Sequence, residues 1–233
     1  MVGIKDLPPP QAAVPTPPRQ EGVVIAQKLL NGEKLMLLYI IRHGETYGNL
    51  NGDGFTETDL TPNGMRQIAF LAKRFHKEHI DRIYTSPLKR ALKTANAIKS
   101  FHPEAPFVVD SLLLEKGTDP EYAGLPDEEI KTLCPYAQLL PRSPLGMEDD
   151  EAAYNRAVKF IEKIKAENDF DSTVVVVAHG TFNSYLVLAA IGFPFKEGFN
   201  FSHLNTGVTL VNYLEEDGIL KTKLKYLNNV SHL

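Results

Sequence analysis

Residues 37–49, which read LLYIIRHGETYGN, are the stretch around which this chain is organised. An apolar run at 37–41 leads directly into Arg42, His43 and Gly44. Such a run, bounded by glycine, is typical of a buried strand in a parallel sheet. Open α/β sheets bind their ligands beyond the carboxyl ends of the strands. The stretch therefore places a guanidinium and an imidazole where a small anion would bind.

A second stretch, VVVVAHG at 174–180, repeats this plan. Four valines lead to His179 and Gly180, so a second predicted strand ends in His-Gly. A lone histidine at a strand end is usually structural, but two of them with nearby arginines favour a functional site.

The composition is that of a soluble globular chain with room for one domain. It has 233 residues, 43% hydrophobic and 23% charged, with a formal charge of −4. We find no basic block that would predict nucleic-acid binding. The single Cys134 excludes an internal disulfide. The N-terminus lacks the apolar core of a secretory signal, and polar residues interrupt 23–41, so we expect no membrane span and a cytoplasmic location.

The chain divides into an arm and one domain. Residues 1–22 carry six prolines between Pro8 and Pro18, which favours a flexible arm, although a ligand for a proline-recognition domain is an alternative. Residues 23–233 are predicted to form a single catalytic domain. Its first part, 23–41, has two apolar runs separated by Asn31-Gly32, a hairpin signal, but the first run also suits a short helix.

The next segments predict a loop, two helices and a strand. Residues 44–61 read as a loop, and Thr61 caps a helix that starts at Pro62. Its apolar face is predicted to hold Met65, Ile68, Ala69, Ala72 and Phe75. A short strand at 80–85 follows. Ser86-Pro87 is predicted to cap a second helix whose inward positions are Leu88, Ala91, Leu92 and Ala95.

The second half continues the alternation of strands and helices. We expect a strand at 107–109, irregular chain at 111–148 with a short helix near 127–133, and a strand at 174–178. Helices are expected at 151–168 and 183–191, the first burying Tyr154, Ala157, Val158, Ile161 and Ile164. Two antiparallel strands, 207–214 and 219–227, close the chain. This pattern predicts an α/β fold, a three-layer α/β/α sandwich with a mostly parallel central sheet.

One local rule is broken at the start of the second helix. Lys89 and Arg90 lie in its first turn, where the helix dipole disfavours cations. Rule-breaking of this kind is expected at functional sites, and an anion bound at the helix start would resolve it. The plainer interpretation is a solvated arginine.

These residue types suit phosphoryl transfer. Arg42 and Arg90 can bind phosphate oxygens, because guanidinium groups match phosphate geometry. A neutral His43 can attack phosphorus and form a phosphohistidine. His179 and Asn49 can donate to phosphate oxygens, and a carboxylic acid would protonate the leaving oxygen.

The ordered motifs resemble those of the histidine phosphatase superfamily, which has the phosphoglycerate-mutase-like fold. They are RHGET with Asn49, then Asp59-Leu60-Thr61 with Gly64, then SPLKRALKTA at 86–95, and AHG at 178–180. The resemblance covers about residues 35–213. It implies that His43 is the phosphorylated nucleophile and that Arg42, Arg90 and His179 form the phosphate pocket with help from Asn49.

The family's proton donor is a Glu that follows a strand and leucines, which Leu114-Glu115 matches. The chain departs from the family pattern just after it, where 117–124 read GTDPEYAG and Ala123 replaces a second Glu. Glu115 is the preferred donor and Glu121 the alternative. Ala178 stands where Ser is common in the family.

The resemblance leaves three functions open. We expect a metal-independent phosphatase, without a cofactor, that acts on a small phosphorylated metabolite. The alternative, a phosphoglycerate mutase, would need paired arginines between Glu115 and His179, where only Arg142 and Arg156 occur. Arg156 is expected on a solvated helix face. The third function is a non-catalytic phosphate-binding module. The sequence does not indicate the substrate or the oligomeric state.

Several aromatic and histidine residues receive structural interpretations. Phenylalanines cluster at 193–201 (Phe193, Phe195, Phe199 and Phe201), and burial in the core is preferred over contact with an apolar leaving group. The other histidines lack metal-site spacing, and we expect them to be structural or surface residues: His76, His79, His102, His203 and His232.

Overall fold

The computed structural model of the protein describes residues 34–51, 59–116, 148–216 and 219–233. The predicted arm at 1–22, the first apolar run after it and the short helix near 127–133 lie outside these ranges, as do Glu121 and Cys134. The division into an arm and one domain therefore stays a prediction.

The described residues form a six-stranded sheet in the order β3-β2-β4-β1-β5-β6. Strands β1, β2, β3 and β4 are mutually parallel, β5 is antiparallel to β1, and β6 is antiparallel to β5. The mostly parallel sheet and the C-terminal hairpin are thus confirmed. The strands are β1 (Lys34–Arg42), β2 (Arg82–Thr85), β3 (Phe107–Val109), β4 (Thr173–Ala178), β5 (Val208–Glu216) and β6 (Ile219–Asn229).

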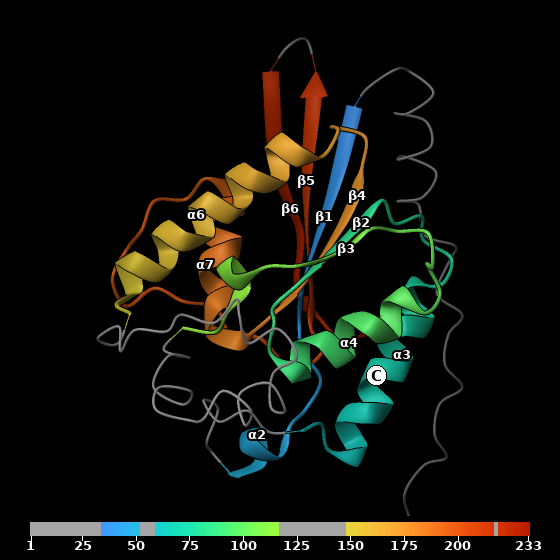
Figure 1. Ribbon diagram of the computed structural model, residues 1–233. Helices are drawn as coiled ribbons and strands as arrows, with labels where there is room; N and C mark the ends of the chain where they lie inside the picture. The colour runs from blue at the N-terminus through green and yellow to red at the C-terminus, as the bar shows by residue number, and fades with distance from the viewer. Residues whose placement is uncertain (1–33, 52–58, 117–147, 217–218) are drawn as a thin grey trace, which may run out of the picture.

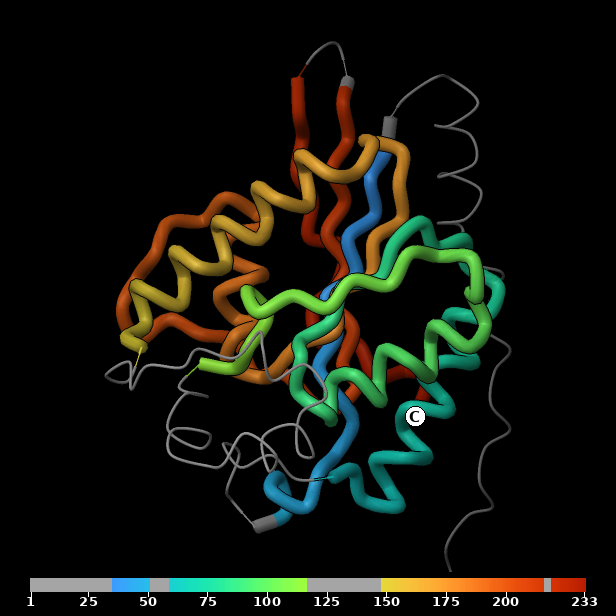
Figure 2. The backbone as a smooth tube through the Cα atoms, in the orientation of Figure 1, coloured from blue at the N-terminus to red at the C-terminus, as the bar shows by residue number. Residues whose placement is uncertain are grey.

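Helices cover both faces of this sheet, which confirms the three-layer α/β/α sandwich (Figure 1). One face carries α3 (Pro62–Phe75) and α4 (Lys89–Lys99), and the other carries α6 (Asp150–Glu167) and α7 (Gly180–Ile191). The backbone trace shows the same three layers without the ribbons (Figure 2). A short α2 (Tyr47–Asn51) follows β1, and a 3₁₀ turn, η1 (Ser111–Leu113), follows β3.

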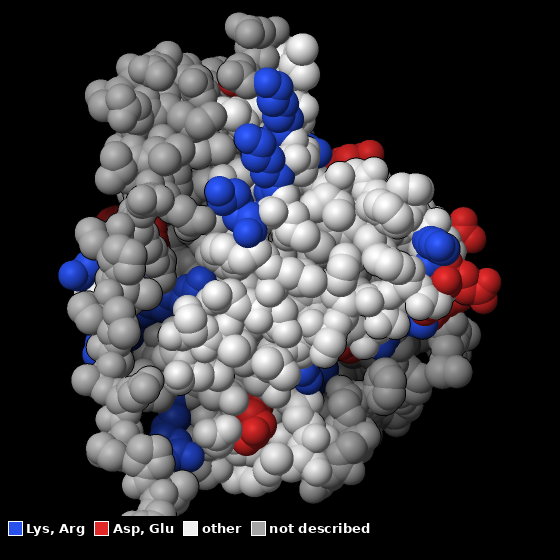
Figure 3. Space-filling model, turned by 180° about the vertical axis from the view of Figure 1, so that it is seen from behind, with Lys and Arg blue, Asp and Glu red and all other residues white. Residues whose placement is uncertain are grey.

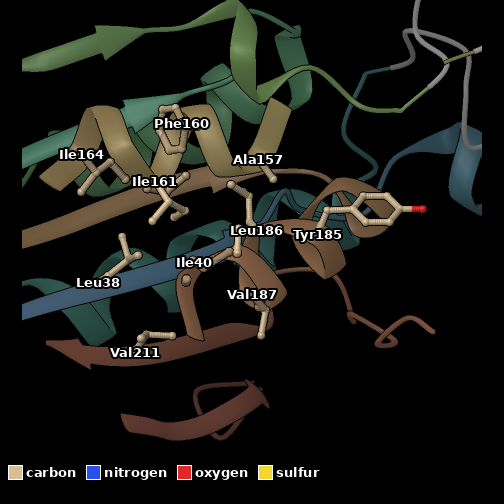
Figure 4. Close-up of a cluster of buried hydrophobic side chains, with 14 of the residues drawn as sticks. Leu38, Ile40, Ala157, Phe160, Ile161, Ile164, Tyr185, Leu186, Val187 and Val211 are labelled. Atoms are coloured by element: carbon tan, nitrogen blue, oxygen red, sulfur yellow. The ribbon is translucent and has the colours of Figure 1, made fainter. Parts of the chain in front are cut away.

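The central strands are buried on both faces, as their apolar runs predict. Alternate residues of β1 point to opposite sides: Leu38 and Ile40 pack towards α6 and α7, while Tyr39 and Ile41 pack towards α3 and α4. Figure 4 shows the first of these clusters, where Leu38 and Ile40 meet Ile161 of α6 and Leu186 of α7. The two cores fix the position of β1 and therefore of the residues that follow it.

Helix α3 corrects the predicted apolar face. Met65 is 50% exposed and Ala69 is also exposed, whereas Leu71 is fully buried. The buried face is Gly64, Ile68, Leu71, Ala72 and Phe75. The capping prediction is confirmed, because the Thr61 side chain accepts a hydrogen bond from the Gly64 N–H at 2.9 Å.

Other helix boundaries also differ from the predictions. The loop at 44–61 contains α2, β2 begins at Arg82 rather than at 80, and α4 starts at Lys89 with Leu88 at its N-cap. Helix α7 starts at Gly180 rather than 183, with His179 at its N-cap. In α6, Ala153 and Phe160 are buried, and Tyr154 and Val158 only partly so.

Strand β6 ends the described sheet and carries exposed lysines: Lys221, Lys223 and Lys225. Lys and Arg side chains form a column at the top of the face in Figure 3. Charge on an edge strand opposes pairing with another chain. Within the described ranges, no helix is both long and apolar enough to cross a lipid bilayer.

Candidate active site

The register between β1 and β4 brings the two His-Gly motifs together. Arg42 lies opposite Ala178, and the His43 N–H donates to the Ala178 carbonyl at 3.1 Å. The next residues, His43 and His179, therefore lie side by side, with ring centroids 5.2 Å apart. The pairing of parallel strands thus builds the imidazole pair that the two sequence motifs predict.

Arg42 lies on the same side of β1 as Leu38 and Ile40, the side that faces α7. Its Nη1 donates to the His203 carbonyl at 2.6 Å. The guanidinium fits against α7 because residue 180 is glycine: an ideal Cβ there would lie 3.2 Å from Arg42 Nε. Burial lowers the pKa of Arg42 and Arg90 lowers it further, while the charge of Glu115 raises it.

His43 is held as a neutral imidazole with its proton on Nδ1. The residue is 3% exposed, and Nδ1 lies 2.7 Å from the Gly44 carbonyl, which can only accept a hydrogen bond. Burial, with the charges of Arg90 and Arg42, lowers the pKa of His43 well below its usual value. Nε2 therefore keeps its lone pair, as nucleophilic attack requires.

Arg90 is brought to the histidines by the start of α4. It is 2% exposed, and its charge contributes to the lowered pKa of both His43 and His179. The Thr94 hydroxyl donates to the Arg90 carbonyl and accepts from the Gly44 N–H, which ties α4 to the end of β1. The neighbouring Lys89 instead forms an ion pair with Asp59 at 3.2 Å.

His179 is fully buried, and Ser86 fixes its ring. The Ser86 Oγ lies 2.7 Å from His179 Nε2 and accepts from the Leu88 N–H at 3.3 Å. This arrangement is satisfied when the hydroxyl donates to Nε2, which leaves the imidazole proton on Nδ1. Among the described residues Nδ1 has no hydrogen-bond partner, so it can donate to a bound anion. Burial and the charge of Arg90 lower the pKa of His179 well below its usual value.

Glu115 is fixed at the N-terminus of α7. It follows η1, and its carboxylate accepts from the Phe182 N–H at 2.9 Å and from the Thr181 N–H at 3.2 Å. A helix N-terminus is a favourable place for a carboxylate. Glu115 is 9% exposed and raises the pKa of Arg42 by its charge, so the structure brings it to the same site. Glu121 cannot be compared with it, because it lies outside the described residues.

Asn49 is held by its oxygen. Its Oδ1 accepts from the Thr46 N–H at 3.1 Å and from Asn205 Nδ2 at 3.0 Å. Asn205 also donates to the His43 carbonyl. Asn205 could not be predicted from the sequence, because nothing in its own segment relates it to the residues 156 and 162 positions earlier.

One pocket of about 320 Å³ joins these groups. Arg42, His43, Asn49 and Glu115 line it, while Arg90 and His179 are buried next to His43. The site combines two guanidinium groups with two neutral imidazoles, so it suits an anion with several oxygen atoms, such as phosphate.

Comparison with known proteins agrees with this geometry. The family model of the histidine phosphatase superfamily (branch 1) matches residues 38–225. The chain belongs to the histidine phosphatase superfamily.

Relatives within the superfamily include phosphatases and a mutase. Phosphoserine phosphatase 1 of Hydrogenobacter thermophilus is 27% identical over 208 residues, which cover 85% of this chain and 95% of that protein. A 2,3-bisphosphoglycerate-dependent phosphoglycerate mutase of Cytophaga hutchinsonii is 27% identical over 62% of this chain and 72% of its own. A phosphoserine phosphatase mutant from Entamoeba histolytica, solved with phosphoserine, matches with a TM-score of 0.59 and 26% identity, covering 85% of this chain and 99% of that one.

Residues 200–203 form part of the pocket wall, and two phenylalanines just before them correct the core interpretation. Phe193 and Phe199 are each 40% exposed and stack at 5.7 Å, so they are not core residues. Phe201 packs on the core and lines the pocket. His203, expected to be structural or at the surface, is 5% exposed and also lines the pocket. Burial and Arg42 lower its pKa to about 4.

Arg156 corrects the expectation of a solvated side chain. Its side chain is 17% exposed and forms a bidentate ion pair with Glu148, at 2.8 and 2.5 Å. The Lys and Glu neighbours on α6 suggest a solvated face, but Glu148 and Leu114, from other segments, cover this arginine.

Proposed function

We propose that this member of the superfamily is a phosphatase that hydrolyses phosphomonoesters of small metabolites through a phosphohistidine on His43. The observation that carries this proposal is the state of His43, which is neutral, protonated on Nδ1 and placed on a pocket wall between arginines. The phosphoserine phosphatases among its relatives, one of them solved with phosphoserine, support a small phosphorylated substrate.

The first step transfers the phosphoryl group to the protein. His43 Nε2 forms a bond to phosphorus while the bond from phosphorus to the ester oxygen breaks. Arg42, Arg90 and His179 bind the phosphoryl oxygens and offset their charge. For this step Glu115 carries a proton, which it gives to the leaving oxygen so that the alcohol departs neutral, and the two N–H donors at the start of α7 then hold the resulting carboxylate.

The second step returns the protein to its starting state. A water molecule gives its proton to the Glu115 carboxylate and attacks phosphorus, and the bond between phosphorus and Nε2 breaks. Inorganic phosphate leaves, His43 is neutral again and Glu115 is protonated for the next cycle. Every proton and bond is accounted for by these two residues and water.

The test is hydrolysis of p-nitrophenyl phosphate in EDTA by the wild type and by His43→Ala. We expect turnover only in the wild type, and a ³²P-labelled protein that survives an alkaline quench but not acid. Equal turnover in both proteins would overturn the role of His43. Turnover by neither, with both folded, would refute hydrolysis of this ester and move attention to the mutase alternative, tested with 3-phosphoglycerate and a bisphosphoglycerate primer.

A cytoplasmic location and independence from metals are part of this proposal. The location is supported by the single cysteine, which fits a reducing compartment. Independence from metals is tested by the EDTA in the assay.

A further inference from the structure

Helix α6 holds the chain on both sides of Glu115. Arg156 Nη1 donates to the carbonyl of Leu114, the residue before Glu115, at 2.8 Å, and to the Leu112 carbonyl at 2.9 Å. On the other side, Lys116 forms an ion pair with Asp150, in the first turn of α6. The main chain that carries Glu115 is thus attached to α6 at two points.

The same arginine also contacts the group that binds the Glu115 carboxylate. Its guanidinium lies over the Phe182 ring, 4.0 Å from the ring centroid. The Phe182 N–H is the donor that holds Glu115 Oε1 at 2.9 Å. The Arg156 side chain therefore contacts both the backbone before Glu115 and Phe182, the residue whose N–H is hydrogen-bonded to the Glu115 carboxylate.

Glu148 fixes the orientation of this guanidinium. Its two oxygens accept from Arg156 Nε and Nη2, which leaves Nη1 directed at the two carbonyls. A bidentate pair is geometrically specific, and lysine cannot reproduce it. The arrangement is more elaborate than anchoring a helix to a loop requires, because Arg156 contacts both the residue before Glu115 and Phe182, whose N–H binds the Glu115 carboxylate.

We propose that Arg156 is a positioning residue that aims Glu115 at the leaving oxygen of the substrate. This inference rests on the proposed function, since it assigns Glu115 as the proton donor of that reaction. Among the described residues, Arg156 is not one of those that line the pocket. It acts by keeping Glu115 where proton transfer can occur, and a displacement of about 1 Å at such a position can cost about 100-fold in rate.

The test compares esters that differ in how much they need a proton donor. The phenolate of p-nitrophenyl phosphate leaves readily, whereas the alkoxide of glycerol phosphate does not. Glu115→Gln gives the reference pattern in kcat/KM, which reports only the phosphoryl-transfer step: a large loss on the alkyl ester and a smaller one on the aryl ester. We expect Arg156→Gln to show the same pattern, with about 100-fold lost on the alkyl ester.

A double mutant separates positioning from general damage. If Arg156 acts through Glu115, then Arg156→Gln has little further effect on the alkyl ester in the Glu115→Gln background. Equal losses on both esters, or losses that multiply, would overturn the inference and leave Arg156 merely structural. A wild type inactive on both esters would instead refute the proposed function, and this inference with it.

Lys163→Gln is the matched control. Lys163 also lies on α6 and forms an ion pair with Asp110, the N-cap of η1, at 2.7 Å, and a second one with Glu167, so its ion pairs in the described chain involve neither Leu114 nor Phe182. We expect the ratio of kcat/KM for the aryl ester to kcat/KM for the alkyl ester to be the same in this variant as in the wild type.

If Arg156→Gln does not fold, Glu148→Gln keeps the arginine and loosens its orientation. It should then show a smaller loss confined to the alkyl ester, and equal losses on both esters would overturn the inference.

Discussion

Ser86 is the side chain that determines which nitrogen of His179 carries the proton. Its hydroxyl bonds to Nε2 at 2.7 Å, while burial keeps the imidazole neutral. Without that hydroxyl a buried Nε2 loses its partner, and the proton is no longer confined to Nδ1. We expect Ser86→Ala to lower kcat/KM for p-nitrophenyl phosphate about tenfold, which corresponds to one net hydrogen bond.

The control for Ser86→Ala is Ser100→Ala, at the other end of α4. The Ser100 hydroxyl is exposed and donates to the Ala97 carbonyl, so its loss should leave kcat/KM at the wild-type value. Steady-state kinetics and thermal unfolding of both variants provide the comparison. A Ser86→Ala enzyme as active as the wild type would show that Ser86 does not set the protonation of His179.

Residues at strand ends could be predicted from the sequence, while their supporting residues could not. Arg42, His43 and His179 follow apolar runs, and parallel strands place such ends together. Ser86 resembles a helix cap in sequence, yet α4 begins three residues later and the hydroxyl serves His179 instead. Nothing local distinguishes Arg156 from its solvated neighbours, because its partners come from other segments.

At the scale of elements, the start of α3 packs directly on the chain that leaves β1. An ideal Cβ on Gly64 would lie 2.0 Å from the Glu45 carbonyl oxygen, a backbone atom that cannot turn aside. The Glu45 side chain in turn accepts from the Thr61 hydroxyl at the cap of α3. We expect Gly64→Ala to lower the free energy of unfolding by about 3 kcal/mol, measured by urea denaturation.

The neighbouring Met65 gives the control for Gly64→Ala. It is 50% exposed, so Met65→Ala should change the free energy of unfolding by less than about 0.5 kcal/mol. If Gly64→Ala were as stable as Met65→Ala, the close packing of α3 on residue 45 would be wrong.

Helix α3 also shows why the presence of a helix is easier to predict from sequence than which of its faces is buried. Thr61-Pro62 marks the start of α3 unambiguously, since both cap chemistry and proline geometry fix it. The apolar residues between 65 and 75, however, are spread around the helix and are not confined to one face. Met65 and Leu71 are both compatible with burial. The close packing of Gly64 on residue 45 sets which side of the helix faces the core, and Leu71 lies on that side.

For the whole molecule, the active-site architecture couples stability to pH. Burial lowers the pKa of five histidines: His43 and His179 well below 6.5, His203 and His232 to about 4, and also His102. In the unfolded chain each recovers an ordinary pKa near 6.5. Below pH 6.5 the unfolded state therefore binds more protons than the folded state, and stability falls as the pH falls.

His203 allows this coupling to be measured at one residue. It is 5% exposed, and among the described residues neither ring nitrogen has a hydrogen-bond partner. With a pKa of 6.5 unfolded and about 4 folded, it contributes stability that is present above pH 6.5 and lost towards pH 4. By linkage the loss is about 2 kcal/mol at pH 5 relative to pH 7.

We expect His203→Phe, which keeps a planar ring but cannot titrate, to remove this part of the pH dependence. Urea unfolding at pH 7 and pH 5 should show the variant losing about 2 kcal/mol less than the wild type between the two conditions. Comparing the two slopes cancels any change in packing that the larger ring causes at both pH values. Parallel stability curves for the two proteins would mean that His203 takes up its proton as readily in the folded state as in the unfolded chain. The pocket wall at His203 would then admit water and charge, contrary to its burial beside Arg42.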